Sequence, residues 1–397
     1  MTVGGSPVVP VVPAVAPAII AAEHVVTPDG ILSPGWLRIA DGRIAAVQPG
    51  PPPTPATHRG HWALPGYVDM HVHGGGGASF TEGGPDDARR AAAFHRAHGT
   101  TRIIASLVTA PVGELERRSA MLADLADEGV IDGIHLEGPF LSAARCGAQN
   151  PRYLALPDVA AFTRLQAASR GWLRMITIAP ELPGASEVIR AAAAAGVIAA
   201  AGHTDASAEA TADAIAAGVS HATHLFNGMR PIAHRSPGPV VALLDHPVTC
   251  EVIADGSHLD DLIIRLTARA AGPGNLVLIT DAMAAAGMSD GDYRLGELDV
   301  TVSGGVARLA GPEHGGVGSI AGSTATMELV VRRAITAVGL PVPDVADAAS
   351  ATPARRLGLD GVTGSLRAGL AADIVLLDEG FRLSEVIARG ERHHPVR

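Results

Sequence analysis

The sequence predicts an α/β protein: a (β/α)8 TIM-like barrel with a small accessory β-sandwich built from both chain ends. The first observation behind this prediction is a series of eight short apolar segments with strand-like composition. The second is the alanine-rich, amphipathic stretches between most of them, such as 86–97, 186–195 and 206–217, which have the apolar spacing of helices. The third is a set of β-like segments near each end of the chain. The eight expected strands are 67–72, 101–106, 131–136, 174–178, 197–201, 219–223, 249–253 and 276–280.

Both ends of the chain carry signals of β-structure. Residues 36–39 are followed by the hairpin turn Asp41-Gly42 and then by a second strand-like run at 43–47. Near the other end, 371–377 is again apolar and strand-like. We therefore expect the two ends to pair into one accessory β domain beside the barrel. The expected domains are 1–64 (N-terminal part of the accessory β domain, with 1–20 as a loose tail), 65–360 (the barrel) and 361–397 (C-terminal part of the accessory β domain).

A doubly wound open parallel sheet is the alternative arrangement for alternating strands and helices. Eight βα units in about 300 residues is the count of a (β/α)8 barrel. No Gly-x-Gly-x-x-Gly follows the first expected strand, so a dinucleotide-binding fold receives no support. These observations favour the barrel.

Composition and charge exclude several classes of function. The net charge of −10 and the absence of a basic block make nucleic acid a poor partner. No apolar run approaches the ~18 residues that a spanning helix needs, so we expect no membrane segment. All 30 basic residues are arginine, which excludes a carboxylated lysine, a Schiff-base lysine and a P-loop lysine. Cys146 and Cys250 are too few for a disulfide framework and fit a cytoplasmic location.

The first expected barrel strand runs into two histidines and four glycines, 74–77. Side chains alternate faces along a strand, so His71 and His73 point to the same side. Two imidazoles at a strand end can hold one metal ion, and glycines allow backbone and substrate to approach closely. The alternative is a pair of hydrogen-bonded histidines with a structural role. The rest of the chain has to decide between the two.

Polar side chains follow other strands at the same end, where barrels of this kind carry their catalytic groups. Glu137 follows the third strand, His203 the fifth, and His224 the sixth. Two histidines and a carboxylate form the ligand set of a hydrolytic metal site with an open position for water. Asp281 follows the eighth strand, where a carboxylate can move a proton from water to a leaving group. Each residue alone could be a buried structural polar group, but a coincidence at five of eight strand ends is improbable.

His71 and His73 lie at the same end of the barrel as these residues. They could hold a second ion, with Glu137 as the bridging ligand because the chain has no lysine for that task. His135 lies on the same strand as Glu137, and we expect it to pack in the core.

Seven segments together resemble the N-acetylglucosamine-6-phosphate deacetylase family of the amidohydrolase superfamily. They occur in family order, and the flanking β segments are similar to the family's accessory sandwich. The Glu-Gly-Pro-Phe element is typical of this branch rather than of relatives whose bridging ligand is a lysine. The matching segments are 65–74, 135–140, 202–206, 223–229, 254–258, 280–283 and 321–323.

This resemblance implies metal-dependent hydrolysis of the acetamide of N-acetylglucosamine 6-phosphate, giving glucosamine 6-phosphate and acetate. It implies Glu137, His203 and His224 as metal ligands and Asp281 as the catalytic acid and base. Zinc is the expected ion, with iron, cobalt and manganese as alternatives, and His71 and His73 predict a second ion. The implied substrate contacts are Ala148, Gln149, Asn227, Gly228, Arg235, His258, Ile320, Ala321 and Gly322.

Arg235 carries a further implication. In relatives the corresponding arginine reaches into the neighbouring subunit's site, so the resemblance implies a homodimer, with a tetramer as the alternative. A guanidinium suits a phosphate because it offers a planar fork of donors.

The sequence departs from the family at Gln149. Well-known members have a histidine there, which helps to hold the substrate. A glutamine can donate a hydrogen bond but cannot become a cation. The departure keeps open a related substrate such as N-acetylgalactosamine 6-phosphate. A barrel that binds amino-sugar phosphates without catalysis is the other alternative, although binding alone requires no general base.

Overall fold

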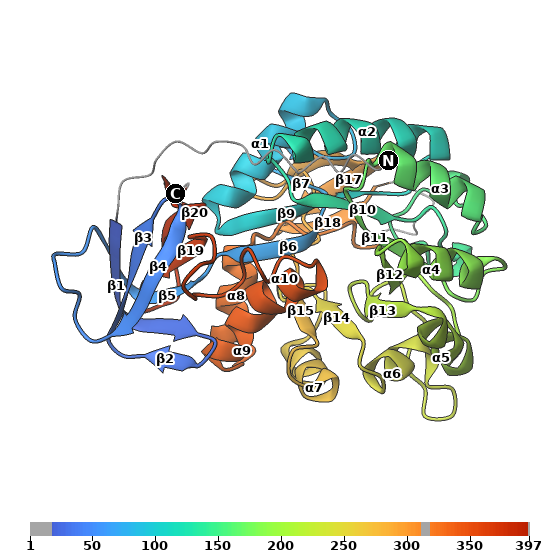
Figure 1. The fold of residues 1–397 in the computed structure, drawn as a ribbon. Coiled ribbons are helices and arrows are strands. Elements are labelled where there is room, and N and C mark those ends of the chain that lie inside the picture. Colours follow the sequence, from blue (N-terminus) through green and yellow to red (C-terminus); the bar gives the residue numbers. More distant parts are fainter. Residues whose placement is uncertain (1–17, 311–317, 396–397) are drawn as a thin grey trace, which may run out of the picture.

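The computed structural model describes residues 18–310 and 318–395, and its centre is a parallel sheet of eight strands curled into a barrel (Figure 1). All eight expected strands are present within a few residues of their predicted limits, so the prediction of a TIM-like barrel is confirmed. The sheet runs in sequence order, each strand paired in parallel with the next. Its strands are β6 (Tyr67–Val72), β9 (Thr100–Leu107), β10 (Gly133–Glu137), β11 (Leu173–Ile178), β12 (Ile198–Ala201), β13 (Val219–Ala222), β14 (Thr249–Val252) and β15 (Leu276–Leu278).

Hydrogen bonds between loop and strand atoms join the first and last barrel strands. Asp281 N–H donates to the His71 carbonyl at 2.9 Å. One residue earlier in the chain, the Thr280 hydroxyl donates to the buried Asp69 carboxylate at 2.6 Å. We call this the seam of the barrel. It brings the chain after β15 against His71 and His73.

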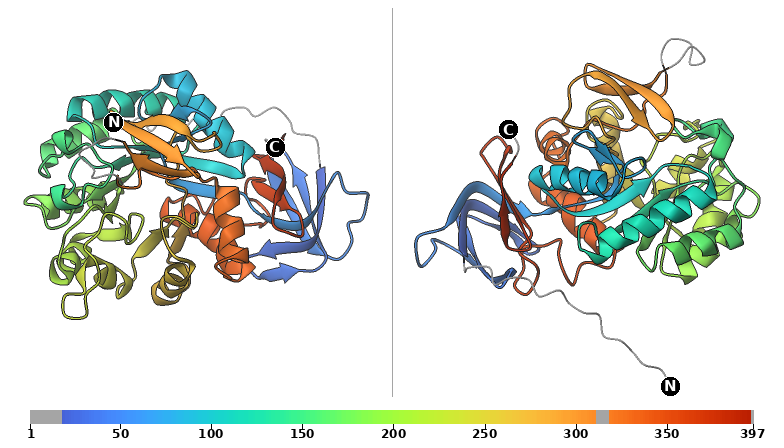
Figure 2. Two further views of the ribbon diagram at one scale, coloured as in Figure 1. Left: turned by 180° about the vertical axis from the view of Figure 1, so that it is seen from behind. Right: turned by 90° about the horizontal axis from the view of Figure 1, so that it is seen from above.

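Helices cover the outside of the barrel (Figure 2). Several begin at a side chain that accepts a backbone N–H, as Asp158, Ser207 and Thr326 do. Their small apolar residues pack on the strands in one continuous core. The helices are α1 (Pro85–Ala97), α2 (Val112–Asp127), α3 (Val159–Ala168), α4 (Ala185–Ala194), α5 (Ala208–Ala217), α6 (Gly238–Leu244), α7 (Asp261–Ala271), α8 (Met327–Thr336), α9 (Val342–Ala346) and α10 (Thr352–Arg356), with short 3-10 turns η1 (Ala143–Arg145) and η2 (Pro151–Tyr153) and a π-helical turn η4 (Asp347–Ala351). No helix among the described residues is both long and apolar enough to cross a bilayer.

Strands from both chain ends form a second sheet beside the barrel, as predicted (Figure 1). Its order is β21-β20-β19-β5-β1-β3-β4, and β2 pairs with β1. The expected tail needs a correction, because Ala18 to Ile20 already belong to β1, and residues 1–17 lie outside the described residues. The predicted domain limits at 64 and 360 remain predictions. The strands are β1 (Ala18–Thr27), β2 (Gly30–Leu32), β3 (Gly35–Ala40), β4 (Arg43–Pro49), β5 (His58–Pro65), β19 (Ile374–Leu377), β20 (Leu383–Ala388) and β21 (Glu391–His393).

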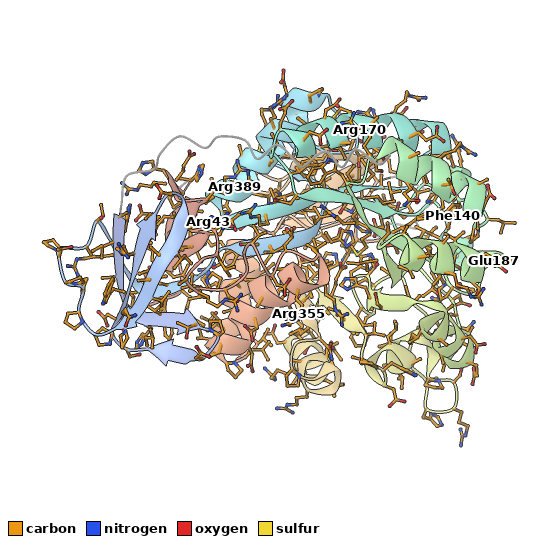
Figure 3. The ribbon with its side chains drawn as sticks, in the orientation of Figure 1. Arg43, Phe140, Arg170, Glu187, Arg355 and Arg389 are labelled. Atoms are coloured by element: carbon orange, nitrogen blue, oxygen red, sulfur yellow. The ribbon has the colours of Figure 1, made fainter. Side chains whose placement is uncertain are left out.

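Charged side chains hold this sheet against the barrel. Buried Arg102 of β9 pairs with Asp373, just before β19, at 2.8 Å and with Asp132, just before β10, at 3.1 Å. Arg389, which lies at the junction in Figure 3, pairs with Asp132 from the other side at 3.4 Å. Because the two arginines face two carboxylates, the cluster compensates its own charge at the amino-terminal ends of the strands.

Three further strands were not expected from the sequence. β16 (Gly291–Leu295), β17 (Leu298–Ser303) and β18 (Val306–Leu309) form an antiparallel sheet inserted between β15 and α8. The insertion brings Leu295 and the segment around Ile320 to the carboxyl ends of the barrel strands. The remaining short pair, β7 (Gly74–Gly75) and β8 (Ala78–Ser79), closes the glycine loop after His73.

Candidate active site

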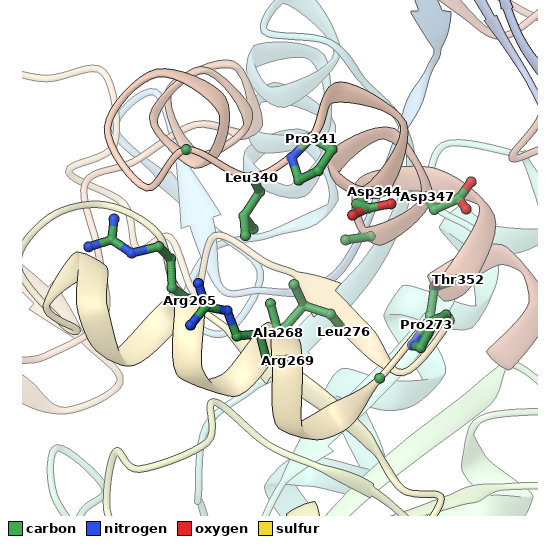
Figure 4. A pocket seen from close by; sticks show the side chains of 14 residues that line it. Arg265, Ala268, Arg269, Pro273, Leu276, Leu340, Pro341, Asp344, Asp347 and Thr352 are labelled. Atoms are coloured by element: carbon green, nitrogen blue, oxygen red, sulfur yellow. The ribbon is translucent and has the colours of Figure 1, made fainter.

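A cavity of about 380 Å³ lies at the carboxyl ends of the barrel strands. It collects most of the residues that the sequence singled out. A second hollow of similar size lies at the amino-terminal end of β15, between α7 and α9 (Figure 4), and contains none of them. The first cavity is therefore the candidate site. Its lining is His73, Glu137, Ala144, Arg145, Gly147, Ala148, Gln149, His203, His224, Asn227, Gly228, His258, Asp281, Leu295, Ser319, Ile320 and Gly322.

Glu137, His203 and His224 form a first group of metal-ligand atoms, as predicted. Glu137 is the last residue of β10, and the histidines follow β12 and β13. Glu137 Oε1 lies 3.1 Å from His203 Nε2 and 2.9 Å from His224 Nε2. The two ring nitrogens are 3.1 Å apart. All three side chains are buried, so their donor atoms converge on one point at the bottom of the cavity.

His71, His73 and Asp281 form a second group. Asp281 Oδ1 lies 3.4 Å from His71 Nε2 and 3.3 Å from His73 Nε2. The sequence offered no partner for Asp281, and the seam of the barrel supplies two. Glu137 lies between the groups, since its oxygens are 3.6 Å from His71 Nε2 and 3.2 Å from His73 Nε2.

The donor chemistry of both groups fits divalent metal ions. In each group two imidazole Nε2 atoms face one another at 3.1 Å, an arrangement in which a cation between the rings can accept both lone pairs. The other ring nitrogen of His203 donates to the Arg145 carbonyl at 3.0 Å, which fixes the ring with Nε2 inward. Metal-bound histidines in proteins are commonly oriented in this way.

The electrostatics of the site also favour bound positive charge. Burial opposes protonation of His71, but Asp281, Glu251 and Glu137 outweigh it and raise its pKa well above the usual value. Burial likewise opposes ionisation of Glu137, but the His71 charge and the His203 hydrogen bond lower its pKa well below the usual value. The pKa of Asp281 is lowered against burial by the His71 charge and the His73 hydrogen bond. The buried carboxylates therefore favour positive charge among their partners, which a metal ion can supply in place of ring protons.

Backbone strain is concentrated at the same residues. His203, His224 and Asp281 have positive φ angles of 47°, 28° and 50°. A residue with a side chain pays about 1–2 kcal/mol for such a conformation, which surrounding contacts must offset. With this left-handed backbone, the side chain of each residue lines the cavity.

Most of the predicted substrate residues meet in this cavity. Ala321 is buried next to the lining rather than in it. Arg235 is exposed, and its Nη1 donates to His234 Nε2 at 2.7 Å, so within one chain it does not line the described cavity. Those that line it are Ala148, Gln149, Asn227, Gly228, His258, Ile320 and Gly322.

Gln149 is held by the protein at both ends of its amide. The Thr109 N–H donates to its oxygen at 2.7 Å, and its nitrogen donates to Glu137 Oε2 at 2.5 Å. One amide hydrogen remains for a ligand. Gln149 thus orients a metal ligand as well as lining the cavity, which the sequence did not indicate.

His258 is paired with Asp255 across 2.8 Å. Burial opposes protonation of the ring, but the Asp255 carboxylate outweighs this effect and raises the pKa of His258. The carboxylate therefore favours the cationic form of the ring, and an N–H of that form suits an anionic or hydroxyl-bearing ligand.

Two charged residues of the site were missed by sequence reasoning. Arg145 lines the cavity, and its Nε donates to Asp205 at 2.8 Å; Arg230 and Arg145 together lower the pKa of Asp205 to about 2. Glu251 is fully buried in β14 and contacts His71. A carboxylate inside an apolar strand is itself a signal, because charges are rarely buried without partners.

Two expectations about neighbouring residues have different outcomes. His135 packs in the core as expected, with its ring nitrogens bonded to Ser106 and Thr177 at 2.9 and 2.8 Å. The glycine loop does not serve the cavity as expected. A Cβ at Gly75 would lie 2.6 Å from both Phe94 and His95 of α1, so the glycines there make room for the helix.

The fold and the site together are those of a barrel hydrolase with two groups of residues suited to divalent metal ions. The amidohydrolase family model matches residues 62–392, and the chain belongs to the amidohydrolase family. A curated relative from Escherichia coli O157:H7, an N-acetylgalactosamine-6-phosphate deacetylase, is 36% identical over 94% of this chain and 98% of its own length. The N-acetylglucosamine-6-phosphate deacetylase of Bacillus subtilis is 34% identical over 92% of this chain and 94% of its own.

A solved structure of a deacetylase is similar to this chain in both sequence and fold. The N-acetyl-D-glucosamine-6-phosphate deacetylase of Mycobacterium smegmatis, in complex with N-acetyl-D-glucosamine-6-phosphate, is 47% identical to this chain. It superposes with a TM-score of 0.91 and covers 95% of this chain and 99% of its own. The family resemblance seen in the sequence motifs is confirmed.

Proposed function

We propose that this protein deacetylates N-acetylglucosamine 6-phosphate, releasing acetate and glucosamine 6-phosphate in amino-sugar breakdown. The observation that carries the proposal is the meeting of Glu137, His203, His224 and Asp281 in one cavity with His258 and the Asn227 loop. The Mycobacterium smegmatis relative, which binds this sugar phosphate, supports the choice of substrate. A complete ligand set with an ionised Asp281 supports catalysis over simple binding.

A bound divalent ion would lower the pKa of water and polarise the acetamide carbonyl. Glu137, His203 and His224 would hold it, and zinc is our choice among the ions that such donors accept. Asp281 accepts a proton as water adds to the carbonyl carbon. It then donates that proton to the nitrogen as the C–N bond breaks, which leaves acetate and the free amine. Donors around the cavity stabilise the charge that develops on the carbonyl oxygen.

We also propose a second ion, held by His71, His73 and Asp281, with Glu137 between the two positions. The 3.2 Å and 3.6 Å distances from Glu137 to these histidines support a bridging carboxylate. Metal analysis of fully loaded protein should give a ratio above one ion per chain. A ratio of one, with His71 and His73 free of metal, would make the pair structural.

We propose that the protein acts as a homodimer in the cytoplasm, with Arg235 binding the phosphate of the substrate in the neighbouring subunit. The exposure of Arg235 and of Ile232, three residues earlier in the same loop, supports a role between subunits. Cys146 and Cys250 are free thiols, which supports the cytoplasmic location.

Mixing two inactive variants tests the shared site. In a random mixture of Arg235→Ala and Asp281→Asn chains, about a quarter of the sites in symmetric dimers combine two intact residues. Activity should therefore return on mixing. An inactive mixture that contains verified mixed dimers would show that Arg235 acts within its own chain.

An acetate-release assay across a panel of sugars tests the reaction itself. The panel contains N-acetylglucosamine 6-phosphate, N-acetylgalactosamine 6-phosphate and unphosphorylated N-acetylglucosamine. The galactosamine compound is the alternative substrate, because the Escherichia coli relative carries that name. We expect the highest kcat/KM with the glucosamine phosphate, and loss and return of turnover on chelation and zinc addition. No acetate from any sugar by metal-loaded protein would refute the proposal.

A further inference from the structure

Glu251 is a fully buried carboxylate behind the two ligand groups. Its Oε2 accepts hydrogen bonds from His71 Nδ1 at 3.1 Å and from the His224 backbone N–H at 2.9 Å. Its Oε1 accepts from His221 Nε2 at 2.9 Å. We infer that Glu251 is a positioning residue that fixes His71 for the second ion and ties that ion's position to the first. This inference rests on the two-ion site proposed above.

The bond to His71 determines which ring nitrogen faces the cavity. An imidazole binds a metal through one nitrogen while the other keeps its proton, and an acceptor at that second nitrogen selects the tautomer. Because Glu251 accepts from Nδ1, the Nε2 lone pair of His71 faces His73 Nε2 at 3.1 Å and Asp281 Oδ1 at 3.4 Å. Without this acceptor, the proton could move to Nε2 and block the donor atom.

The bond to the His224 backbone joins the two groups. His224 follows β13 with a φ of 28°, a conformation that needs outside support. The same Glu251 oxygen that holds the His71 ring holds this backbone N–H. One carboxylate oxygen therefore supports a ligand in each group.

Burial and charge argue against a passive core residue. A carboxylate with no exposed surface is tolerated only when donors replace its water. Two of the three donors to Glu251 come from residues that carry metal-ligand atoms. Its negative charge adds to those of Glu137 and Asp281, which together offset three of the four positive charges of two divalent ions.

Zinc binding to two substituted proteins tests the inference. In Glu251→Met the side chain has similar length but no acceptor. We expect about 10–100-fold weaker binding of the second zinc ion in competition with a chelator, the usual effect of losing such a partner. In Glu251→Gln the amide oxygen can still accept from His71, while its nitrogen donates to His221 once that ring carries its proton on Nδ1. We expect this variant to stay much closer to the wild type.

Asp373→Asn is the matched control, because Asp373 is an equally buried carboxylate at the opposite end of the strands. It should leave both zinc affinities unchanged. If Glu251→Met does not fold, ¹⁵N spectra of the zinc-loaded wild type give the answer. They should show His71 protonated at Nδ1.

Any of these results would overturn the inference: unchanged second-ion affinity in Glu251→Met, equal losses in the Met and Gln variants, or a His71 proton on Nε2. A wild-type protein that binds one ion and still releases acetate would overturn this inference and leave the proposed reaction intact. If the zinc affinities of the variants change as expected but no acetate is released, the proposed reaction would be overturned and this inference would stand.

Discussion

Gly228 is the position where one added methyl group should have the clearest effect on the site. It has a φ of 59°, and a Cβ there would lie 2.9 Å from His203 Nδ1 and 3.2 Å from the Arg145 carbonyl oxygen. Those two atoms make the 3.0 Å hydrogen bond that orients His203. In Gly228→Ala the methyl group must therefore displace the ring, the carbonyl or both.

The expected cost has two parts. Forcing alanine into the left-handed conformation costs about 1–2 kcal/mol of folding free energy. Loss of the hydrogen bond to His203 adds about 1 kcal/mol and should weaken metal binding about 10–100-fold. Gly358→Ala separates the two effects, since Gly358 has a φ of 69° and no atom within 4 Å of the added Cβ. We expect the control to lose stability alone.

Urea unfolding of metal-free protein and zinc competition with a chelator measure the two parts. Gly228→Ala should be less stable than Gly358→Ala and should also bind zinc more weakly. Wild-type zinc affinity in Gly228→Ala would refute the argument, because the Arg145 carbonyl would then not orient His203. An equal loss of zinc affinity in the control would refute it as well.

Three further predictions follow from contacts described above. Asp281→Asn should lower kcat about 10²–10⁴-fold, the range for a lost acid–base group, while the Glu137 group keeps its ion; undiminished acetate release would exclude the proton-transfer role. Burial lowers the pKa of His95 to about 4, below its unfolded value, so stability should fall by up to about 3 kcal/mol as pH drops from 6.5 to 4. In His95→Gln the free energy of unfolding, measured with urea, should change less between pH 6.5 and 4. An unchanged dependence on pH would show that His95 is not its cause. Gln149→Leu should lower the free energy of unfolding, measured with urea, by about 2–4 kcal/mol, because two buried polar groups lose their hydrogen-bond partner. The same substitution at the exposed Gln48 should leave the free energy of unfolding almost unchanged.

The barrel was predictable because its strands are buried on both sides. Such strands are short, apolar and bounded by glycine or proline, and Tyr67–Val72 matched its predicted limits. The inserted sheet at 291–309 was missed because it interrupts the strand–helix rhythm after β15. Its strands do alternate polar and apolar residues, so the local signal of half-exposed strands was present, but nothing in it gave the position of the insertion over the barrel.

The candidate site was partly predictable for a geometric reason. Residues after parallel strands must meet at one end of a barrel, so Glu137, His203, His224 and Asp281 could be grouped without a structure. Contacts that cross the barrel could not be derived in this way. The bond from Glu251 to His71 depends on the register of strands 180 residues apart. The contact between Phe94 and the glycine loop is much closer in sequence, but it depends on how α1 packs against the barrel.

The seam between β6 and β15 has a consequence for how the site arises during synthesis. Glu137, His203 and His224 come from strands that are neighbours or near neighbours in the sheet, so the three ligands lie within the middle of the chain. The group of His71, His73 and Asp281 joins the first strand to the segment after the last, across a separation of 210 residues. Contacts so distant in sequence form late, because the intervening chain must be ordered first. Closure of the barrel thus decides when the proton-transfer residue reaches the cavity, and the site is complete only once the first strand meets the segment after the last.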